Sequence, residues 1–288
     1  MSDVHIPGNA VFNGAQPGNE PENDFMRMPN NMSTYVAPQV PEPEDAQALV
    51  AALERAENLL AALAQYRVGE PSRMISLDDL DTENRRFFDQ LLGEGEVSVR
   101  YHSDPAARIQ ESVLAGVWRA QQFNTANAKA DQLISNTIEV ADMPALVRKN
   151  TFAHARENVS LQDLDIPDTV CNAPPLLAEI HGKLTKWLPG MTPHVINLSL
   201  LPHTGEDLDF LSRALGIGPT LILSRGYGNC RISSTNTRNV WWVQYYNSQD
   251  VLILNTLEIS DVPEVACAAV EDLQESRQRL EEILAMYR

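Results

Sequence analysis

Apolar and polar residues follow different patterns in successive parts of the chain. Residues 1–44 are rich in Pro, Asn and Gly and show no apolar period. Such a segment cannot bury enough apolar surface to offset the entropy lost on ordering, so it is predicted to be a disordered arm. Residues 45–70 are rich in Ala and Leu and free of Pro, with the leucines spaced along one helical face. This spacing predicts an amino-terminal helix.

Twelve residues then occur twice, as "LISNTIEVADMP" at 133–144 and "LILNTLEISDVP" at 252–263, with seven identical positions. A constant offset of 123 also pairs Leu92 with Leu215 and Trp118 with Trp241, and "ISLDDL" at 75 matches "INLSLL" at 196 after a two-residue shift. We interpret the chain as an internal duplication. The expected parts are a first repeat at 75–150, a connector with a helix at 151–195, and a second repeat with a terminal helix at 196–288.

Each repeat shows the same order of elements. A short apolar strand leads into a helix, for which Asp81 and Thr204 are predicted N-caps and Gly93 and Gly216 predicted ends. Four alternating strands follow, and an Asp-x-Pro sequence then predicts the start of a second helix. The predicted fold is therefore α+β. It consists of two tandem β-α-β-β-β-β-α units with antiparallel sheets, related by a pseudo-twofold axis, plus the amino-terminal helix and the disordered arm.

The repeats differ on one face of their predicted sheets. The first carries Ser98, Arg100 and Arg119 where the second carries Leu221, Leu223 and Trp242. A sheet that is apolar on both faces must be covered on both. We therefore expect the second repeat to pack beneath the amino-terminal helix, the connecting helix or another protein. The first repeat is expected to leave this face in water.

Charge and composition restrict the class of partner. The 288 residues include 39 acidic and 22 basic ones, a net charge of -17, which opposes nucleic acid and anionic membrane surfaces. No apolar run is long enough to span a bilayer, and the first residues lack the order of a secretory signal. We expect a cytoplasmic protein without membrane insertion. Its three cysteines form no CxxC, which indicates neither a disulfide framework nor a thiolate metal site.

Candidate catalytic groups are few. Glu139 and Glu258 occupy matching places in the repeated strands and could act as paired carboxylates, one as general acid and one as general base. The alternative, which we favour, is that each caps the adjacent turn or pairs with Arg108 or Arg231. The histidines show no metal-ligand spacing, and no nucleophile has a recognisable base beside it. The sequence therefore predicts no enzyme, no cofactor and no metal ligands.

Several strings in order resemble one known family. They include "LLGEGEVSVR" (91–100), "DLDFLSRALGIG" (207–218), "NVWWVQYYN" (239–247) and "LEISDVPEV" (257–265). From about residue 75 to the end, the chain is similar to the HupH/HyaF/HoxQ hydrogenase expression and formation proteins. The resemblance implies an accessory role in forming an uptake [NiFe] hydrogenase, at the iron-sulfur small subunit before twin-arginine export. It also implies a second accessory protein of the HupG/HyaE/HoxO type as partner. Some descriptions of the family speak instead of nickel insertion.

We therefore expect a maturation chaperone that binds the small-subunit precursor through the second repeat. The candidate contact residues are Tyr227, Trp241, Trp242, Tyr245 and Tyr246, with Glu94 and Arg100 in the first repeat. The competing interpretation of the aromatic residues is that they are core, which must hold for at least one of the adjacent tryptophans. Two other functions stay open: a metal-dependent or nickel-insertion maturation enzyme, and a structural subunit of a maturation heteromer whose arm orders on its partner.

Overall fold

The computed structural model describes residues 49–124, 132–160, 165–226 and 228–288. The predicted arm at 1–44 lies outside the described residues. In chain order the elements are α1 (Val50–Gln65), β1 (Arg73–Ser76), α2 (Thr82–Leu92), β2 (Val97–Tyr101), β3 (Ala106–Glu111), β4 (Val117–Asn124), β5 (Gln132–Val140), α3 (Ala145–Asn150), α4 (Ala173–Leu184), β6 (His194–Asn197), the 3-10 turn η2 (Leu198–Leu200), α5 (Gly205–Leu215), β7 (Thr220–Ser224), β8 (Asn229–Ser234), β9 (Val240–Tyr246), β10 (Leu252–Ile259), η3 (Glu264–Ala266) and α6 (Val270–Ala285).

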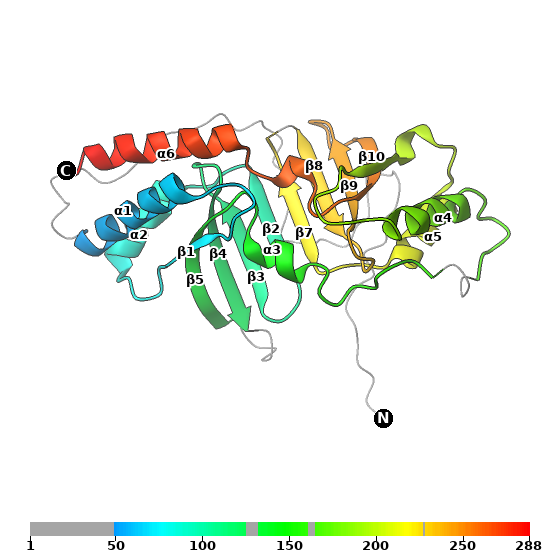
Figure 1. Ribbon diagram of the computed structural model, residues 1–288, viewed down its shortest axis with the longest axis horizontal. Helices are drawn as coiled ribbons and strands as arrows, with labels where there is room; N and C mark the ends of the chain where they lie inside the picture. Colours follow the sequence, from blue (N-terminus) through cyan, green and yellow to red (C-terminus); the bar gives the residue numbers. More distant parts are fainter. Residues whose placement is uncertain (1–48, 125–131, 161–164, 227) are drawn as a thin grey trace, which may run out of the picture.

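All ten strands form one antiparallel sheet in the order β1-β5-β4-β3-β2-β7-β8-β9-β10-β6 (Figure 1). The two halves of this order are the two predicted repeats, joined where β2 pairs with β7. The offset of 123 carries Val99 onto Ile222, and these two residues are directly opposite each other. The pseudo-twofold axis therefore passes through this pair. The predicted duplication is confirmed, and the two meanders share one sheet because β2 and β7 complete each other's backbone hydrogen bonds.

The helices α1 and α4 hold equivalent places before β1 and β6. In the first unit, Asn84 Oδ1 accepts a hydrogen bond from Ala52 N at 2.9 Å and so ties α2 to the first turn of α1. Asp207 stands 123 residues later on α5, and its Oδ1 accepts from Ala173 N, the first residue of α4, at 3.0 Å. The helix predicted in the connector is therefore the counterpart of the amino-terminal helix, and the repeated unit begins with a helix.

The predicted ends of α2 and α5 are confirmed. The side chains of Asp81 and Thr204 accept from the backbone N–H three residues on, and Thr204 forms a capping box. Gly93 and Gly216 follow the last helical residues with φ of 52° and 73°, in the left-handed region that glycine enters without steric cost. Both helices therefore end at a glycine whose backbone conformation other residues rarely adopt.

The predicted second helix of each unit differs from expectation. Asp142 does not cap α3, because its carboxylate bonds the Tyr66 hydroxyl and pairs with Arg148. The side chain of Glu139 accepts from Ala145 N instead, at 2.7 Å. In the second unit the equivalent chain forms only η3, and α6 begins several residues later.

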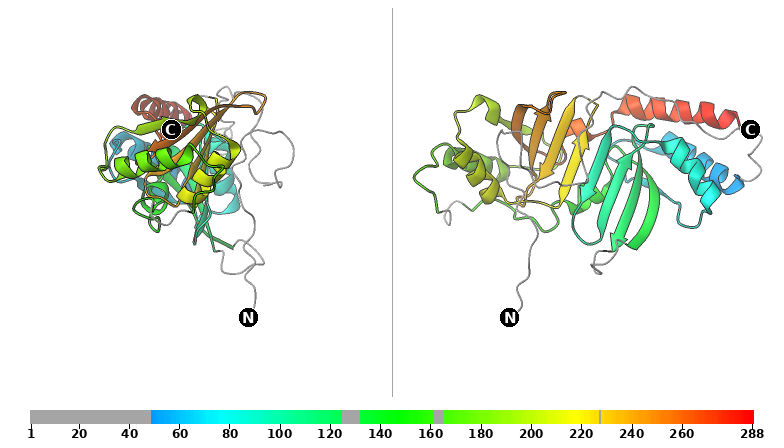
Figure 2. Two further views of the ribbon diagram at one scale, coloured as in Figure 1. Left: turned by 90° about the vertical axis from the view of Figure 1, so that its right-hand side faces the viewer. Right: turned by 180° about the vertical axis from the view of Figure 1, so that it is seen from behind.

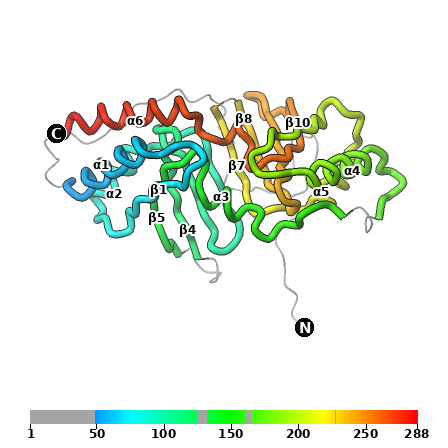
Figure 3. The backbone as a smooth tube through the Cα atoms, viewed as in Figure 1, coloured from blue at the N-terminus to red at the C-terminus, as the bar shows by residue number. Residues whose placement is uncertain are grey.

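Two segments cross between the units. The α6 helix leaves the second unit and packs along α1 of the first, so the carboxyl terminus lies beside the amino-terminal helix (Figures 1 and 3). Ser276 Oγ on α6 donates to Ala115 O at 2.9 Å, and Tyr287 packs edge-on against Phe87. In the opposite direction, the chain after α3 reaches the second unit, where Arg156 donates to Ala214 O. Each unit therefore contributes a segment that packs on, or forms hydrogen bonds with, the other unit.

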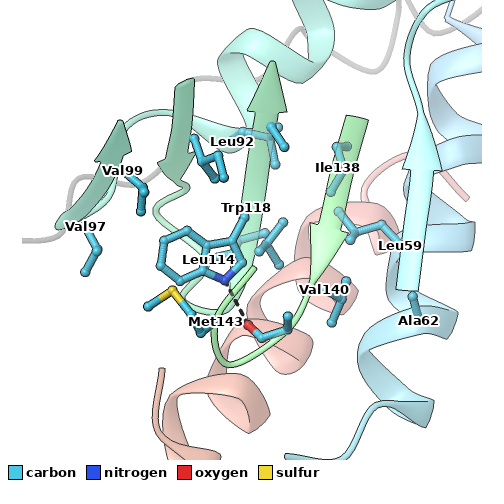
Figure 4. Packing of buried hydrophobic residues seen from close by; sticks show 14 of the residues in the cluster. Leu59, Ala62, Leu92, Val97, Val99, Leu114, Trp118, Ile138, Val140 and Met143 are labelled. Carbon is cyan, nitrogen blue, oxygen red and sulfur yellow. Dashed lines mark hydrogen bonds between the residues drawn. The ribbon is translucent and has the colours of Figure 1, made fainter. Parts of the chain in front are cut away.

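The sheet has an inner face, which carries Val99 and Ile222, and an outer face, which carries Ser98 and Leu221. Residues after α3 cover the middle of the inner face: the Phe152 ring contacts Trp241 edge-to-face at 5.0 Å, and Thr151 bonds Thr220. The core of the first unit lies around Trp118, whose indole donates to Ala141 O (Figure 4). Figure 2 shows the same two-part arrangement from the side and from behind.

The outer face of the second unit is covered by α4 and α5, whose Leu177 and Leu211 share a core cluster with Trp242. This confirms the expected cover by the connecting helix. The expectation for the first unit is met only in part. Arg119 is half-buried and paired with Asp89 of α2, and Arg100 is also half-buried, so this face is not simply in water.

Candidate partner-binding surface

Both tryptophans of β9 are core residues. Trp241 is 0 % and Trp242 1 % exposed. Trp241 lies on the inner face against Phe152, and Trp242 on the outer face, where its indole donates to Asn255 Oδ1. At least one was expected in the core; both are, because β9 is covered on its two faces. Neither side chain is at the surface for a partner to contact.

The other candidate contact residues do not share one surface: Tyr245 and Tyr246 are neighbours on β9 with side chains on opposite faces, and Glu94 and Arg100 belong to the first unit. Tyr245 is half-buried against the core beside Cys230, and burial raises the pKa of its hydroxyl. The Tyr246 hydroxyl donates to Gln244 at 3.3 Å. Glu94 is exposed at the end of α2, while Arg100 lies on β2. Tyr227 lies outside the described residues. The structure therefore does not bring this set together as one site.

The two glutamates do not form a catalytic pair. Glu139 lies on β5 and Glu258 on β10, with six strands between them. At about 4.8 Å between neighbouring strands, this separation is on the order of 30 Å. No proton relay between general acid and base spans such a distance, so the paired-carboxylate hypothesis is wrong. Glu139 instead caps the turn at α3, as the favoured interpretation held. Burial raises the pKa of Glu258, which shows no pairing with Arg231.

The two ends of the sheet offer a closer comparison. The strands β1 and β6 are its edges, each paired on one side only. They align at an offset of 121, and the alignment extends before each strand: Gly69 and Gly190 occupy the same turn with φ of 89° and 80°. Equivalent positions along the two edges can therefore be compared one by one.

Charged residues along the first edge are replaced by apolar residues along the second. The equivalent pairs are Arg67 and Leu188, Glu70 and Met191, and Asp79 and Leu200. On the first edge, Arg55 of α1 donates to the Ser76 carbonyl at 3.0 Å and pairs with Asp79. Charges at an edge discourage pairing with other chains. The first edge is therefore protected by its own side chains.

The second edge exposes its apolar residues to solvent. Leu188 is 66 %, Val195 50 % and Leu200 80 % exposed. Three contacts hold this segment along β10: Gly190 N donates to Asp261, Val195 lies opposite Glu258, and Asn255 N donates to Ser199 Oγ. From Asn255 to Asp261 the segment follows the chain of β10 for roughly 20 Å at 3.3 Å per residue.

We call this strip the β6 edge surface, and define it by Leu188, Met191, Val195, Leu200 and Ile253 of the neighbouring β10. It combines an unpaired strand edge with a row of apolar side chains. Such an edge can accept an extended segment of another chain through backbone hydrogen bonds and side-chain burial. The residues differ between the repeats at the 121 offset, which is the signal in the sequence that could have located the surface.

Among the described residues, no group of three or more His, Cys, Asp or Glu side chains lies close enough to hold a metal ion. In the same part of the chain, no helix has the length and apolar character needed to cross a membrane.

The chain is thus an α+β protein built from a duplicated unit on one continuous sheet, with one charged edge and one apolar edge. The chain belongs to the HupH family: the family model described as "HupH hydrogenase expression protein, C-terminal conserved region" matches residues 49–160 and 170–287. Both matched segments begin at the leading helix of a unit. The resemblance seen in the sequence is thus confirmed, and it extends over both repeats.

Individual relatives cover nearly the whole chain. Hydrogenase expression/formation protein HupQ of Azotobacter chroococcum is 45 % identical over 274 residues, 94 % of each chain. Hydrogenase expression/formation protein HupH of Rhodobacter capsulatus is 42 % identical over 289 residues, 100 % of each chain. A solved structure of hydrogenase expression protein HupH from Thiobacillus denitrificans is 32 % identical and covers 40 % of this chain and 95 % of its own, with a TM-score of 0.38.

Proposed function

We propose that this protein is an accessory chaperone in the formation of an uptake [NiFe] hydrogenase. In the cytoplasm it holds the iron-sulfur small-subunit precursor before twin-arginine export. Family membership supports the role in hydrogenase formation, since the relatives are named as expression/formation proteins. The observation that carries the binding role is the replacement of three charges on the first edge by Leu188, Met191 and Leu200 on the second.

The β6 edge surface is the proposed binding site for an extended segment of the precursor. Such a segment would pair with the outer backbone groups of β6 and bury its apolar side chains against Val195 and Leu200. Each apolar side chain that is fully buried contributes about 1.5–3 kcal/mol. A segment already paired within a finished subunit has no free backbone groups to offer. The edge therefore selects the unfinished client without any catalytic step.

Placing a charged residue of the first edge at the equivalent position of the second edge tests this role. We expect Leu200→Asp, which places the residue of position 79 at its counterpart, to lower recovery of the complex at least tenfold, because a carboxylate would have to be desolvated (about 1.4 kcal/mol or more). The measurement is co-purification of the full chain with a tagged small-subunit precursor. Met74→Lys at the first edge is the matched control, since Met74 is also exposed (58 %).

Circular dichroism of each variant separates loss of binding from loss of fold. Full recovery of the complex with folded Leu200→Asp, or its loss with Met74→Lys alone, would remove the β6 edge surface from the proposal. The same measurement with the second accessory protein of the HupG/HyaE/HoxO type assigns the partner. If only that protein is lost with Leu200→Asp, the surface does not hold the precursor.

A further inference from the structure

Among the residues that the structure describes, no helix covers the middle of the outer face of the sheet (Figure 2). It is formed by β3, β2, β7 and β8, and lies between α2 at one end and α5 at the other. Side chains on the inner face of these strands are buried: Val99, Ile109, Ile222 and Ile232 are each no more than 2 % exposed. Most of their outer-face neighbours are half-buried or exposed, namely Ser98, Arg100, Arg108, Gln110, Leu221, Arg231 and Ser233, whereas Leu223 is only 7 % exposed. In the view from behind, no helix crosses these strands (Figure 2).

Two arginines on this open face have no anionic partner among the described residues. Arg100 lies on β2 directly opposite Arg108 on β3. Like charges facing each other across strands are destabilising. Burial, and then the charge of Arg108, lower the pKa of Arg100. Arg231 lies on β8, and its Nε is buried without a hydrogen-bond partner.

The lack of a partner is not explained by a shortage of carboxylates. The chain has 39 acidic and 22 basic residues, and other arginines are engaged. Arg119 at the margin of the same face pairs with Asp89, and Arg288 forms two hydrogen bonds to Glu57. Within the described part of the chain, Arg100 and Arg231 have no ion-pair partner, although both are half-buried in a strongly acidic protein. An anion from another molecule would offset the repulsion between Arg100 and Arg108. It would also give the buried Arg231 Nε a hydrogen-bond acceptor.

We propose that the open outer face binds an acidic polypeptide segment of a partner protein, whose carboxylates pair with Arg100 and Arg231. The two residues stand two strands and two positions apart in register, because Arg100 faces Leu221 and Arg231 faces Leu223. Their Cα atoms are thus about 12 Å apart. Two carboxylates four residues apart on an extended segment lie on the same side of it and match this spacing at about 3.3 Å per residue.

The remaining groups on the face suit a polypeptide. Ser98 and Ser233 supply hydroxyls beside the arginines, and Leu221 between them supplies apolar contact. The guanidinium group binds carboxylates through two parallel hydrogen bonds, which gives orientation as well as affinity. Both side chains are long enough to converge on one small anion, so inorganic phosphate is the competing ligand in the test below. This face is separate from the β6 edge surface, so the two proposals stand or fall independently.

The pseudo-twofold axis does not duplicate this site. The counterpart of Arg231 is Arg108, whereas the counterpart of Arg100 is Leu223, which is 7 % exposed. Only one side of the axis therefore has an arginine on the strand next to the centre. A bound segment would lie in one direction rather than in two equivalent ones.

The test uses the full chain and two labelled decapeptides, one alternating Glu and Ser and the other alternating Gln and Ser. Fluorescence anisotropy measures binding at low salt. We expect the acidic peptide to bind and the neutral one not to bind, with affinity falling as salt rises. The double variant Arg100→Gln with Arg231→Gln is expected to weaken binding at least tenfold. Arg288→Gln, which removes an arginine at the far end of the chain, and Leu200→Asp should leave it unchanged.

Four results would overturn the assignment. They are no binding of the acidic peptide by the wild-type chain, equal binding of the neutral peptide, unchanged binding by the folded double variant, and equal or tighter binding of inorganic phosphate or an oligonucleotide at the same arginines. Single variants sharpen the result. If Arg100→Gln and Arg231→Gln each weaken binding in part, both residues contact the same segment.

Discussion

The two units have one fold and two different surfaces. Residues that determine the backbone are kept, such as Gly69 with Gly190 and Gly93 with Gly216 at matching turns. Residues along the edges differ: Asp79 pairs with Arg55 on the first edge, and Leu200 at the same place is exposed. The two units therefore share the residues that shape the backbone and differ at edge positions that other molecules can reach.

The largest difference in stability between the units is expected at the hydrogen bonds that join the leading helix to the next helix. Asp207 is buried, and its carboxylate accepts from the backbone N–H groups of Cys171, Asn172, Ala173 and Thr204. Burial alone would raise its pKa, but these donors outweigh it and hold the pKa at about 2. In the first unit, Asn84 accepts from one residue of α1, Ala52.

We expect Asp207→Ala to lower the free energy of unfolding by about 3–5 kcal/mol, because it leaves several buried donors unpaired. Asn84→Ala should cost about 1–2 kcal/mol. Urea denaturation at pH 7 measures both. Since the folded pKa lies below the usual 3.8, the contribution of Asp207 is present above pH 3.8 and is lost as pH falls towards 2. Equal losses for the two variants would contradict the comparison.

A buried carboxylate in the first unit has a serine as its counterpart in the second. Glu111 is 6 % exposed, and burial raises its pKa to about 7, although Gly116 N donates to it. Its equivalent, Ser234, bonds the backbone of Thr220. Because the folded pKa lies above the usual 4.5, the neutral form is favoured on folding, and stability falls as pH rises from 4.5 to 7.

Glu111→Gln should therefore raise the free energy of unfolding by up to about 3 kcal/mol at pH 8 and change little at pH 4. Denaturation curves at the two values test this. Ser234→Ala serves as the control, since a hydroxyl does not titrate in this range. A gain of the same size at both pH values would show that the carboxylate is not the cause.

The smallest difference in stability is expected for substitutions of the equivalent residues Trp118 and Trp241. Trp118 donates its indole hydrogen to Ala141 O at 2.8 Å, whereas the indole nitrogen of Trp241 is buried without a partner. Replacement by Phe removes a hydrogen bond in the first case and none in the second. We expect Trp118→Phe to be more destabilising than Trp241→Phe by about 1 kcal/mol. The reverse order in thermal denaturation would show that ring packing against Phe152 outweighs the hydrogen bond.

Local patterns predicted most of the fold. The strand at Val240–Tyr246 lies where alternation indicated, and the duplicated order follows from fixed offsets. The cap of α3 was wrong because Asp142, a good local candidate, is engaged by Tyr66, a residue 76 positions away. The continuous sheet was also missed, since both meanders looked complete in sequence and only their pairing joins them.

The candidate site was harder to predict for the same reason. Adjacent aromatic residues on a strand suggested a contact surface, yet cover on both faces of β9 depends on α4, α5 and the chain after α3. Composition cannot show which apolar residues remain uncovered. The charged counterparts of Leu188 and Leu200 can be read from the sequence, but only the structure shows that the two leucines are exposed along a strand edge. Arg100 was singled out from the sequence, but its unpaired neighbour Arg231 was considered only as an ion-pair partner.

The place of α6 has a consequence for synthesis of the chain. This sixteen-residue helix is made after all ten strands, yet it packs on α1, which is made before them. While the ribosome is still translating, the first unit has no cover for that side, however much of its own sequence has emerged. Its final packing must wait until α6 has left the ribosome, so α1 and α6 meet only after the second unit has been translated.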